Sequence, residues 1–234
     1  MISEVIILSG GLGTRLKSVI KDIPKPLAEI CGKPFLAYVF DFLRKQKIKR
    51  IVLSVGYKFD AIKNFFGNNY KDINLIYAIE GKLLGTGGAI KHALKYTHNK
   101  EVFVLNGDTL FNIDLGIFFN LHKNKKSKLS IALKKMELAE RYGTIEIDKN
   151  NRIINFSEKT RRFNVLINGG IYLLNKEFFN SLSTSEEFSF EKHFLEEYYK
   201  NHKFYGFPFD GYFIDIGTPE DYERAKKEFK KFKY

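Results

Sequence analysis

The sequence predicts an α/β fold in which a mostly parallel sheet is flanked by helices and carries a small antiparallel insertion. Short apolar runs alternate with amphipathic stretches over residues 5–134, a pattern typical of parallel strands joined by helices. Near Arg141 the pattern changes to short strands joined by polar turns, which predicts the antiparallel part. The chain has 234 residues and 44% of them are hydrophobic, enough for one domain with a complete core.

The first half supplies alternating strands and helices. The predicted strands are short runs of apolar residues at 5–8, 51–55, 75–79, 102–105 and 129–134. The predicted helices have apolar residues three and four positions apart and span 35–46, 58–66, 88–96 and 114–123. Gly67 follows the second helix, where glycine is a common stop signal. In such a fold, ligands bind at the carboxyl ends of the strands.

The second half is less regular. Its predicted strands lie between polar turns at 143–147, 153–157, 170–174, 205–209 and 212–214. Two helices are predicted at 190–199 and 219–232, and Pro219 is well suited to the first turn of the second one. No hexapeptide repeat occurs, so the sequence predicts no C-terminal β-helix.

Charge and composition exclude several classes of function. The chain carries 39 basic and 27 acidic residues, a net charge of +12. Its lysines are spread along the chain, whereas a nucleic-acid surface concentrates arginine and aromatic residues on one face. We therefore expect no nucleic-acid partner. The sequence lacks an apolar run of membrane-spanning length and a signal peptide, which predicts a cytoplasmic protein without membrane contact.

The cysteine and the histidines give no site. Cys31 is the single cysteine, which excludes an intrachain disulfide, and we expect it to be a small core residue beside Ile30. The five histidines, at positions 92, 98, 122, 193 and 202, have no metal-ligand spacing and are expected at the surface.

A glycine-rich loop follows the first predicted strand. Gly10, Gly11 and Gly13 allow the backbone to approach a ligand and to point N–H groups at it. Arg15 adds a planar, permanently charged fork that suits phosphate oxygens. The loop is not a Walker A motif, and Leu16 occupies the third glycine position of a dinucleotide fingerprint. The loop therefore predicts a nucleotide without defining the chemistry.

Lys25 lies between Pro24 and Pro26, and the prolines hold its backbone extended. We interpret Lys25 as a rigidly held cation that contacts a triphosphate at the reacting phosphorus. An exposed lysine in a proline-bounded loop is the alternative.

Three motifs occur in order: Gly-Gly-x-Gly-Thr-Arg-Leu at 10–16, Pro-Lys-Pro-Leu at 24–27 and Gly-Lys-Pro at 32–34. Together they resemble the sugar-1-phosphate nucleotidylyltransferases. The Leu-Gly-Thr-Gly-Gly-Ala segment at 84–89 and the short chain are most similar to the guanylyltransferases of D-glycero-D-manno-heptose 1-phosphate and mannose 1-phosphate. The resemblance implies a Rossmann-like fold of the nucleotide-diphospho-sugar transferase type. It also implies one catalytic domain over residues 1–234, with a nucleotide part at 1–135 and a sugar-phosphate part at 136–218.

The resemblance also implies roles for individual residues. Arg15, Lys25 and Asp108 would be catalytic. The implied nucleotide-binding residues are Leu8, Gly10, Gly11, Gly13, Thr14, Arg15, Lys25, Glu80, Gly85, Thr86 and Gly88. The implied sugar-phosphate residues are Asn106, Gly143, Glu158, Lys159 and Asn168.

Asp108 and Asp215 each follow a predicted strand, where the sheet would deliver both carboxylates to one site. Mg²⁺ takes one or two carboxylates together with substrate phosphate and water, so the pair predicts a magnesium site. The resemblance implies the same two ligands. A turn or helix-cap role is the alternative for either aspartate alone.

Glu80 bears on the choice of base. Its two oxygens can accept the adjacent N1–H and exocyclic amine of guanine, whereas uracil and thymine offer one ring N–H between two acceptors. A solvent-facing glutamate is the alternative.

The predicted substrates are GTP and a sugar 1-phosphate, with Mg²⁺ as cofactor and a nucleotide-sugar for surface polysaccharide synthesis as product. The resemblance also allows a homodimer. Two alternatives stay open: a UTP- or CTP-dependent enzyme for another sugar phosphate, and a silent regulator that binds nucleotide-sugars. Intact Arg15, Lys25, Asp108 and Asp215 argue against the silent regulator.

Overall fold

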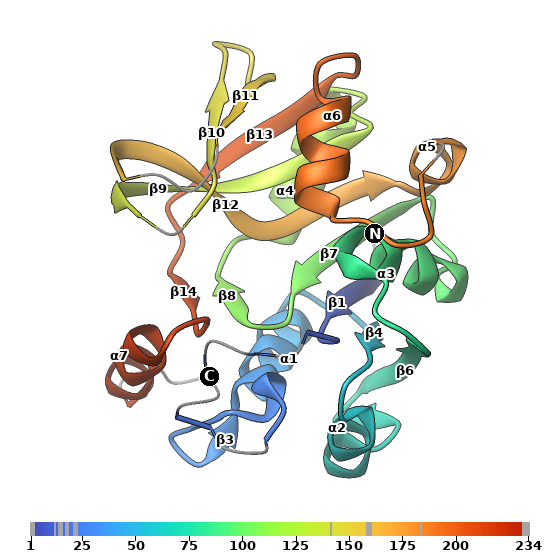
Figure 1. The fold of residues 1–234 in the computed structure, drawn as a ribbon, viewed down its shortest axis with the longest axis vertical. Coiled ribbons are helices and arrows are strands. Elements are labelled where there is room, and N and C mark those ends of the chain that lie inside the picture. Colours follow the sequence, from blue (N-terminus) through green and yellow to red (C-terminus); the bar gives the residue numbers. More distant parts are fainter. Residues whose placement is uncertain are drawn as a thin grey trace.

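The computed structural model describes residues 3–11, 13, 16, 19, 20, 23–140, 142–157, 161–182 and 184–230 (Figure 1). A ten-stranded sheet forms its centre. The parallel half of this sheet has the order β7-β1-β4-β6, with the short β5 at its edge. These strands are β1 (Glu4–Leu8), β4 (Arg50–Val55), β5 (Asn69–Tyr70), β6 (Ile73–Ile79) and β7 (Glu101–Asn106).

The antiparallel part is confirmed, and it continues the same sheet. It lies at the opposite end of the molecule from α1 and α2 (Figure 1). The long strand β12 pairs with β7, β9 and β10, and β13 pairs in parallel with β9. The strands are β9 (Leu129–Ala139), β10 (Thr144–Ile147), β11 (Ile153–Ser157), β12 (Arg162–Asn175) and β13 (Phe204–Phe209).

Two pairs of short strands lie outside this sheet. They are β2 (Glu29–Ile30) with β3 (Lys33–Pro34), and β8 (Thr109–Phe111) with β14 (Phe213–Asp215).

The helices begin at residues that suit their first turn. The side chains of Asp114, Asn175 and Thr218 accept backbone N–H groups at the starts of α4, α5 and α7. The helices are α1 (Phe35–Lys45), α2 (Phe59–Phe66), α3 (Gly85–Ala93), α4 (Leu115–Asn124), α5 (Lys176–Ser181), α6 (Glu196–Tyr198) and α7 (Pro219–Phe229). The shorter turns are η2 (Lys25–Leu27), η3 (Leu94–Tyr96) and the π-helical η4 (Phe190–Leu195).

The sheet separates two hydrophobic clusters. Alternate residues of a strand point to opposite faces, so Val5 and Ile7 join one cluster while Ile6 joins the other. The first cluster contains α1 and α7 residues, and the second contains Ile90 of α3 and Phe190 of η4. Helix α3 and η4 therefore share one face of the sheet. Within the described ranges, no helix has the length and apolar character needed to cross a membrane.

Two expectations about single residues are wrong. Cys31 is exposed, because it forms the β2–β3 turn with a positive φ of 51°. His122 is buried, because Ser130 and Glu101 satisfy its ring nitrogens. Its Nδ1 lies 2.9 Å from Ser130 Oγ, and its Nε2 lies 3.2 Å from Glu101 Oε2.

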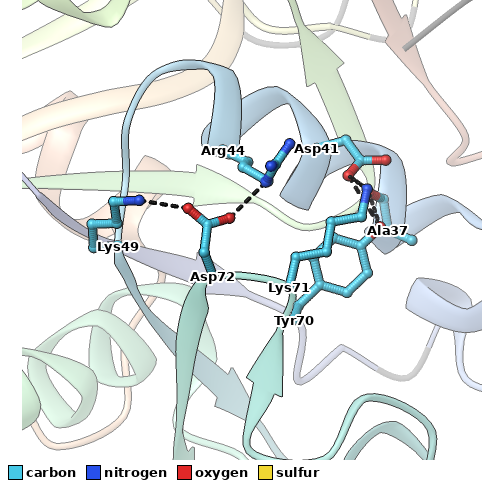
Figure 2. Close-up of polar contacts among 7 residues, drawn as sticks. All are labelled: Ala37, Asp41, Arg44, Lys49, Tyr70, Lys71 and Asp72. Carbon is cyan, nitrogen blue, oxygen red and sulfur yellow. Dashed lines mark hydrogen bonds and ion pairs between the residues drawn. The ribbon is translucent and has the colours of Figure 1, made fainter.

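Helix α1 is fixed to the β5–β6 turn by two carboxylates (Figure 2). Asp41 is buried and accepts hydrogen bonds from Lys33, from Lys71 at 2.7 Å and from the Tyr70 hydroxyl at 3.2 Å. Asp72 is exposed and lies between Arg44 and Lys49. The two carboxylates therefore tie the same segments together in different surroundings.

These surroundings predict different stabilities for Asp41→Asn and Asp72→Asn. Burial acts to raise the pKa of Asp41, but hydrogen bonds from Lys33 and Lys71 outweigh it and the pKa is lowered. The loss from Asp41→Asn should therefore be about 1–3 kcal/mol at neutral pH and should shrink on acidification, as the carboxylate becomes protonated. Asp72→Asn should cost less because water screens its partners. Urea unfolding of both variants between about pH 3 and pH 7 tests this, and equal losses would contradict it.

Candidate active site

A cavity of about 370 Å³ opens at the carboxyl ends of the parallel strands. It gathers segments from the first glycine loop, from the ends of β4, β6 and β7, and from η4. Of the residues predicted to bind substrate, metal or nucleotide, those in its wall are Leu8, Gly10, Gly11, Gly13, Lys25, Glu80, Gly85, Thr86, Asn106 and Asp108. The topology therefore brings together residues that are far apart in the sequence.

Lys25 and Asp108 meet in the wall of the cavity. The Lys25 ammonium donates to Asp108 Oδ2, and the lysine side chain is only 10% exposed. The expectation that the prolines hold the Lys25 backbone extended is wrong: Pro24 is extended, but Lys25 begins the short helix η2, in which Pro26 fits the first turn. Gly13 has a φ of +58°, and a Cβ there would lie 3.2 Å from Lys25 Cβ. Glycine at position 13 thus fits both the left-handed turn and the lysine stem beside it.

Asp215 lies beside this pair. Strand β14 ends at Asp215 and pairs with β8, so that Asp215 is opposite Thr109 and the Ile216 N–H donates to the Asp108 carbonyl at 3.0 Å. Burial, followed by the charge of Asp108, raises the pKa of Asp215 to about 6, although Lys25 and the Gly217 N–H act in the opposite direction. Two carboxylates therefore share one nearby ammonium.

Glu80 also lines the cavity, directly after β6. Its Oε1 accepts the Ser54 hydroxyl at 2.9 Å, and its Oε2 accepts the Leu84 N–H at 3.4 Å. A Cβ at Gly10 would lie 2.8 Å from Glu80 Oε1, so the first glycine loop approaches this carboxylate closely. Each carboxylate oxygen has a second lone pair and can still accept a donor from a ligand.

The second glycine loop is packed against protein. Cβ atoms at Gly85 and Gly88 would lie 2.5 Å and 2.3 Å from the carbonyl oxygens of Phe188 and Glu186. A Cβ at Gly87 would lie 2.1 Å from the Phe188 ring. The resemblance implies that Gly85 and Gly88 bind the nucleotide, but these glycines also make room for residues 186–188. Gly85 still lines the cavity, whereas Gly88 is not part of its wall.

Of the described residues that the resemblance assigns to the sugar phosphate, the structure brings only one into the cavity wall. Asn106 lines the cavity, whereas Gly143 and Asn168 do not. The Asn168 side chain donates to the Tyr172 hydroxyl at 2.8 Å and accepts the Gly170 N–H at 3.0 Å. The Gly143 carbonyl accepts the Asn168 N–H at 3.4 Å. Thr14, Arg15, Glu158 and Lys159 lie outside the described residues.

Several wall residues were not identified from the sequence. Glu191 is the charged one, and it is the second residue of the segment that the sequence predicts only as a helix at 190–199. The others are Ser9, Pro26, Ser54, Leu83, Ala89, Gly107 and Gly217. No signal in the sequence places Glu191 next to residues 80–88, because more than a hundred positions separate Thr86 from it.

This chain is similar to several known proteins over nearly its whole length. Residues 4–231 match the family described as Nucleotidyl transferase. The D-glycero-alpha-D-manno-heptose 1-phosphate guanylyltransferase of Aneurinibacillus thermoaerophilus is 50% identical over 229 residues, covering 98% of this chain and 99% of that protein. The protein of the same name from Campylobacter jejuni subsp. jejuni serotype O:2 is 52% identical over 219 residues, 94% and 96% of the two chains. The structure of HddC from Yersinia pseudotuberculosis complexed with GMP-PN has a TM-score of 0.88 and 40% identity, covering 97% of this chain and all of that one.

The raised pKa of Asp215 predicts that Asp215→Asn stabilises the folded chain. The pKa of Asp215 is about 6 in the folded chain, against 3.8 for an ordinary aspartate. At a pH where the carboxyl group is ionised, this difference lowers the stability of the folded state. In EDTA the variant should gain up to roughly 3 kcal/mol above about pH 6 and nothing below about pH 4. Urea unfolding across this range measures the gain.

The exposed Asp210 precedes β14, and Asp210→Asn is the matched control. It should give no such pH-dependent gain. A gain from Asp215→Asn that is the same at both ends of the pH range would contradict the account.

Proposed function

This chain belongs to the nucleotidyl transferase family, and we propose that it transfers GMP from GTP to D-glycero-α-D-manno-heptose 1-phosphate, releasing pyrophosphate. The observation that carries the proposal is identity of 50% and 52%, over nearly the whole chain, to two guanylyltransferases of that heptose phosphate. The cavity supports it, because its wall contains the carboxylate of Glu80 and the ion pair of Lys25 with Asp108. Asp215 lies beside that ion pair but is not part of the wall.

The reaction needs no covalent enzyme intermediate. An oxygen of the sugar phosphate attacks the α-phosphorus of GTP in line, and the bond to the departing pyrophosphate breaks as the new P–O bond forms. Catalysis is then a matter of positioning the two substrates and offsetting their negative charge. Lys25 would exchange its contact with Asp108 for one with the α-phosphate. We also propose that Arg15 holds the leaving pyrophosphate and that Lys159 contacts the sugar phosphate.

The residues present fit a magnesium ion. Asp215 is partly buried beside the charge of Asp108. Both effects raise its pKa, and a nearby cation would relieve them. Among the residues that the structure describes, no group of three or more His, Cys, Asp and Glu is placed to hold a metal. Mg²⁺ suits such a site because substrate phosphates and water complete its ligands. We propose that Asp108 and Asp215 hold Mg²⁺, which would offset charge on the transferring phosphate.

Glu80 is the proposed reader of guanine. Ser54 and Leu84 already orient its carboxylate, which leaves acceptor capacity toward the cavity. Guanine offers two adjacent donors to such a group. A pyrimidine would leave one carboxylate oxygen without a partner from the base, and such mismatches cost more than a missing methylene would.

The proposal extends to the role of the product. GDP-heptose would be an activated donor for surface polysaccharide synthesis, made in the cytoplasm where GTP is supplied. The homodimer and the lack of nucleic-acid and membrane partners stay predictions of the sequence.

A pyrophosphate-release screen tests the reaction. With heptose 1-phosphate, kcat/KM for GTP should exceed that for UTP, CTP and ATP by at least about a hundredfold, because Glu80 selects the two guanine donors. Glu80→Gln should reduce this preference, since an amide presents an N–H to one of those donors. The exposed Glu177→Gln is the control and should leave it unchanged. Equal or better use of UTP would contradict both the base assignment and the role of Glu80.

Metal dependence is tested separately. Asp108→Asn and Asp215→Asn should each lower kcat by at least about a hundredfold while the fold is retained, because charge on the transferring phosphate loses its counter-ion. EDTA should abolish activity of the parent, and added Mg²⁺ should restore it as the control. Full activity in EDTA would rule out the magnesium assignment.

A further inference from the structure

A latch joins the second glycine loop to η4. The Thr86 hydroxyl donates to Glu191 Oε2 at 2.7 Å and accepts the Phe190 N–H at 2.8 Å. Ser189, just before η4, donates its hydroxyl to the same Glu191 oxygen at 3.2 Å. Thr86 and Glu191 both line the cavity. The contact therefore lies in the wall of the site, where a bound ligand would cover it.

Backbone contacts bring the two segments to this position. The Gly87 N–H donates to the Phe188 carbonyl at 2.9 Å, and the Phe188 N–H donates to the Leu84 carbonyl at 3.0 Å. Gly85, Gly87 and Gly88 leave no space for a Cβ against residues 186–188. The start of α3 is thus held by residues 186–188, which come just before η4.

The π-helical form of η4 also points to function. The six residues Phe190–Leu195 form a π-helix, and such turns are rare and occur often at functional sites. Phe190 contacts the ring of the buried Tyr172 edge-on at 5.0 Å, and the Tyr172 hydroxyl accepts the Asn168 amide. Phe190, the neighbour of Glu191, therefore packs on the tyrosine that Asn168 contacts.

We propose that Glu191 is a positioning residue that fixes the nucleotide-binding loop through Thr86, and so sets the affinity for the nucleoside triphosphate. This rests on the proposed function, because it assigns residues 80–88 to the nucleotide. Before a ligand binds, water competes for the Thr86–Glu191 hydrogen bond, so the bond adds little to folding stability. A bound nucleotide excludes that water, and the bond then holds the loop in one position.

Steady-state kinetics on Thr86→Val, Thr86→Ser and Glu191→Ala test the proposal. Thr86→Val keeps the shape and removes the hydroxyl, so KM for GTP should rise about tenfold, the effect of one lost hydrogen bond to a charged group. KM for the sugar phosphate should change less than twofold, and Thr86→Ser should restore the parental KM for GTP. Thermal unfolding should show that all variants keep their fold.

A double-mutant cycle separates the latch from direct contact of Thr86 with the nucleotide. Thr86→Val and Glu191→Ala combined should raise KM for GTP no more than the larger single change, because both remove the same bond. The matched control is Glu186→Ala, which removes an exposed ion pair with Lys82 between the same two segments. It should leave KM for GTP within about twofold, since surface pairs contribute little.

Four results would overturn the latch. They are an unchanged KM for GTP in Thr86→Val, a rise confined to the sugar phosphate, an equal rise in Glu186→Ala, and additive effects of Thr86→Val and Glu191→Ala in the double variant. If the parent prefers another triphosphate, the proposed function fails. The latch is then judged in the same way by KM for that preferred triphosphate.

Discussion

Two carboxylates near a single ammonium group set the main constraint on this molecule. Asp108 holds Lys25, and burial beside Asp108 raises the pKa of Asp215 to about 6. Two neighbouring carboxylates lower the stability of the folded state at neutral pH, so the surrounding structure must hold them in place. Asp108 follows β7, Asp215 ends β14 in the β8–β14 pair, and prolines flank Lys25. Groups that develop or carry negative charge in phosphoryl transfer need this kind of fixed surrounding.

The two glycine loops meet different physical demands. In the first loop, Gly13 adopts a positive φ beside the stem of Lys25, and Gly10 lies against the Glu80 carboxylate. In the second loop, the glycines lie against Phe188 and Glu186. The first loop is thus shaped around side chains that line the cavity. The second is shaped around a protein segment from the other half of the chain, which supplies Glu191 to the cavity wall.

Sequence patterns were sufficient for the elements whose burial is simple. The apolar run at 5–8 and the amphipathic stretch at 35–46 correspond to β1 and α1. Helix α3 begins at Gly85, three residues before its predicted start. Its N-terminal glycines pack against residues 186–188, and this contact stabilises the first turn. Strand β12 extends well beyond the predicted 170–174, since its polar outer half is held by pairing with β9. Tertiary pairing of this kind leaves no periodic signal.

The site residues that could be predicted are those that lie in a local sequence motif. Lys25, Glu80 and Asp108 line the cavity, and each was singled out by proline neighbours or by its place after a strand. Glu191 could not be found in this way, because its role depends on a contact with Thr86 that only the folded chain creates.

Anomalous diffraction from Mn²⁺, in crystals grown with GTP, tests the central claim most directly. The account predicts an anomalous peak for a Mn²⁺ ion that both Asp108 and Asp215 coordinate. It also predicts that the Lys25 ammonium contacts the triphosphate and no longer Asp108. A bound nucleotide with Lys25 still on Asp108, and with no metal between the two carboxylates, would contradict it.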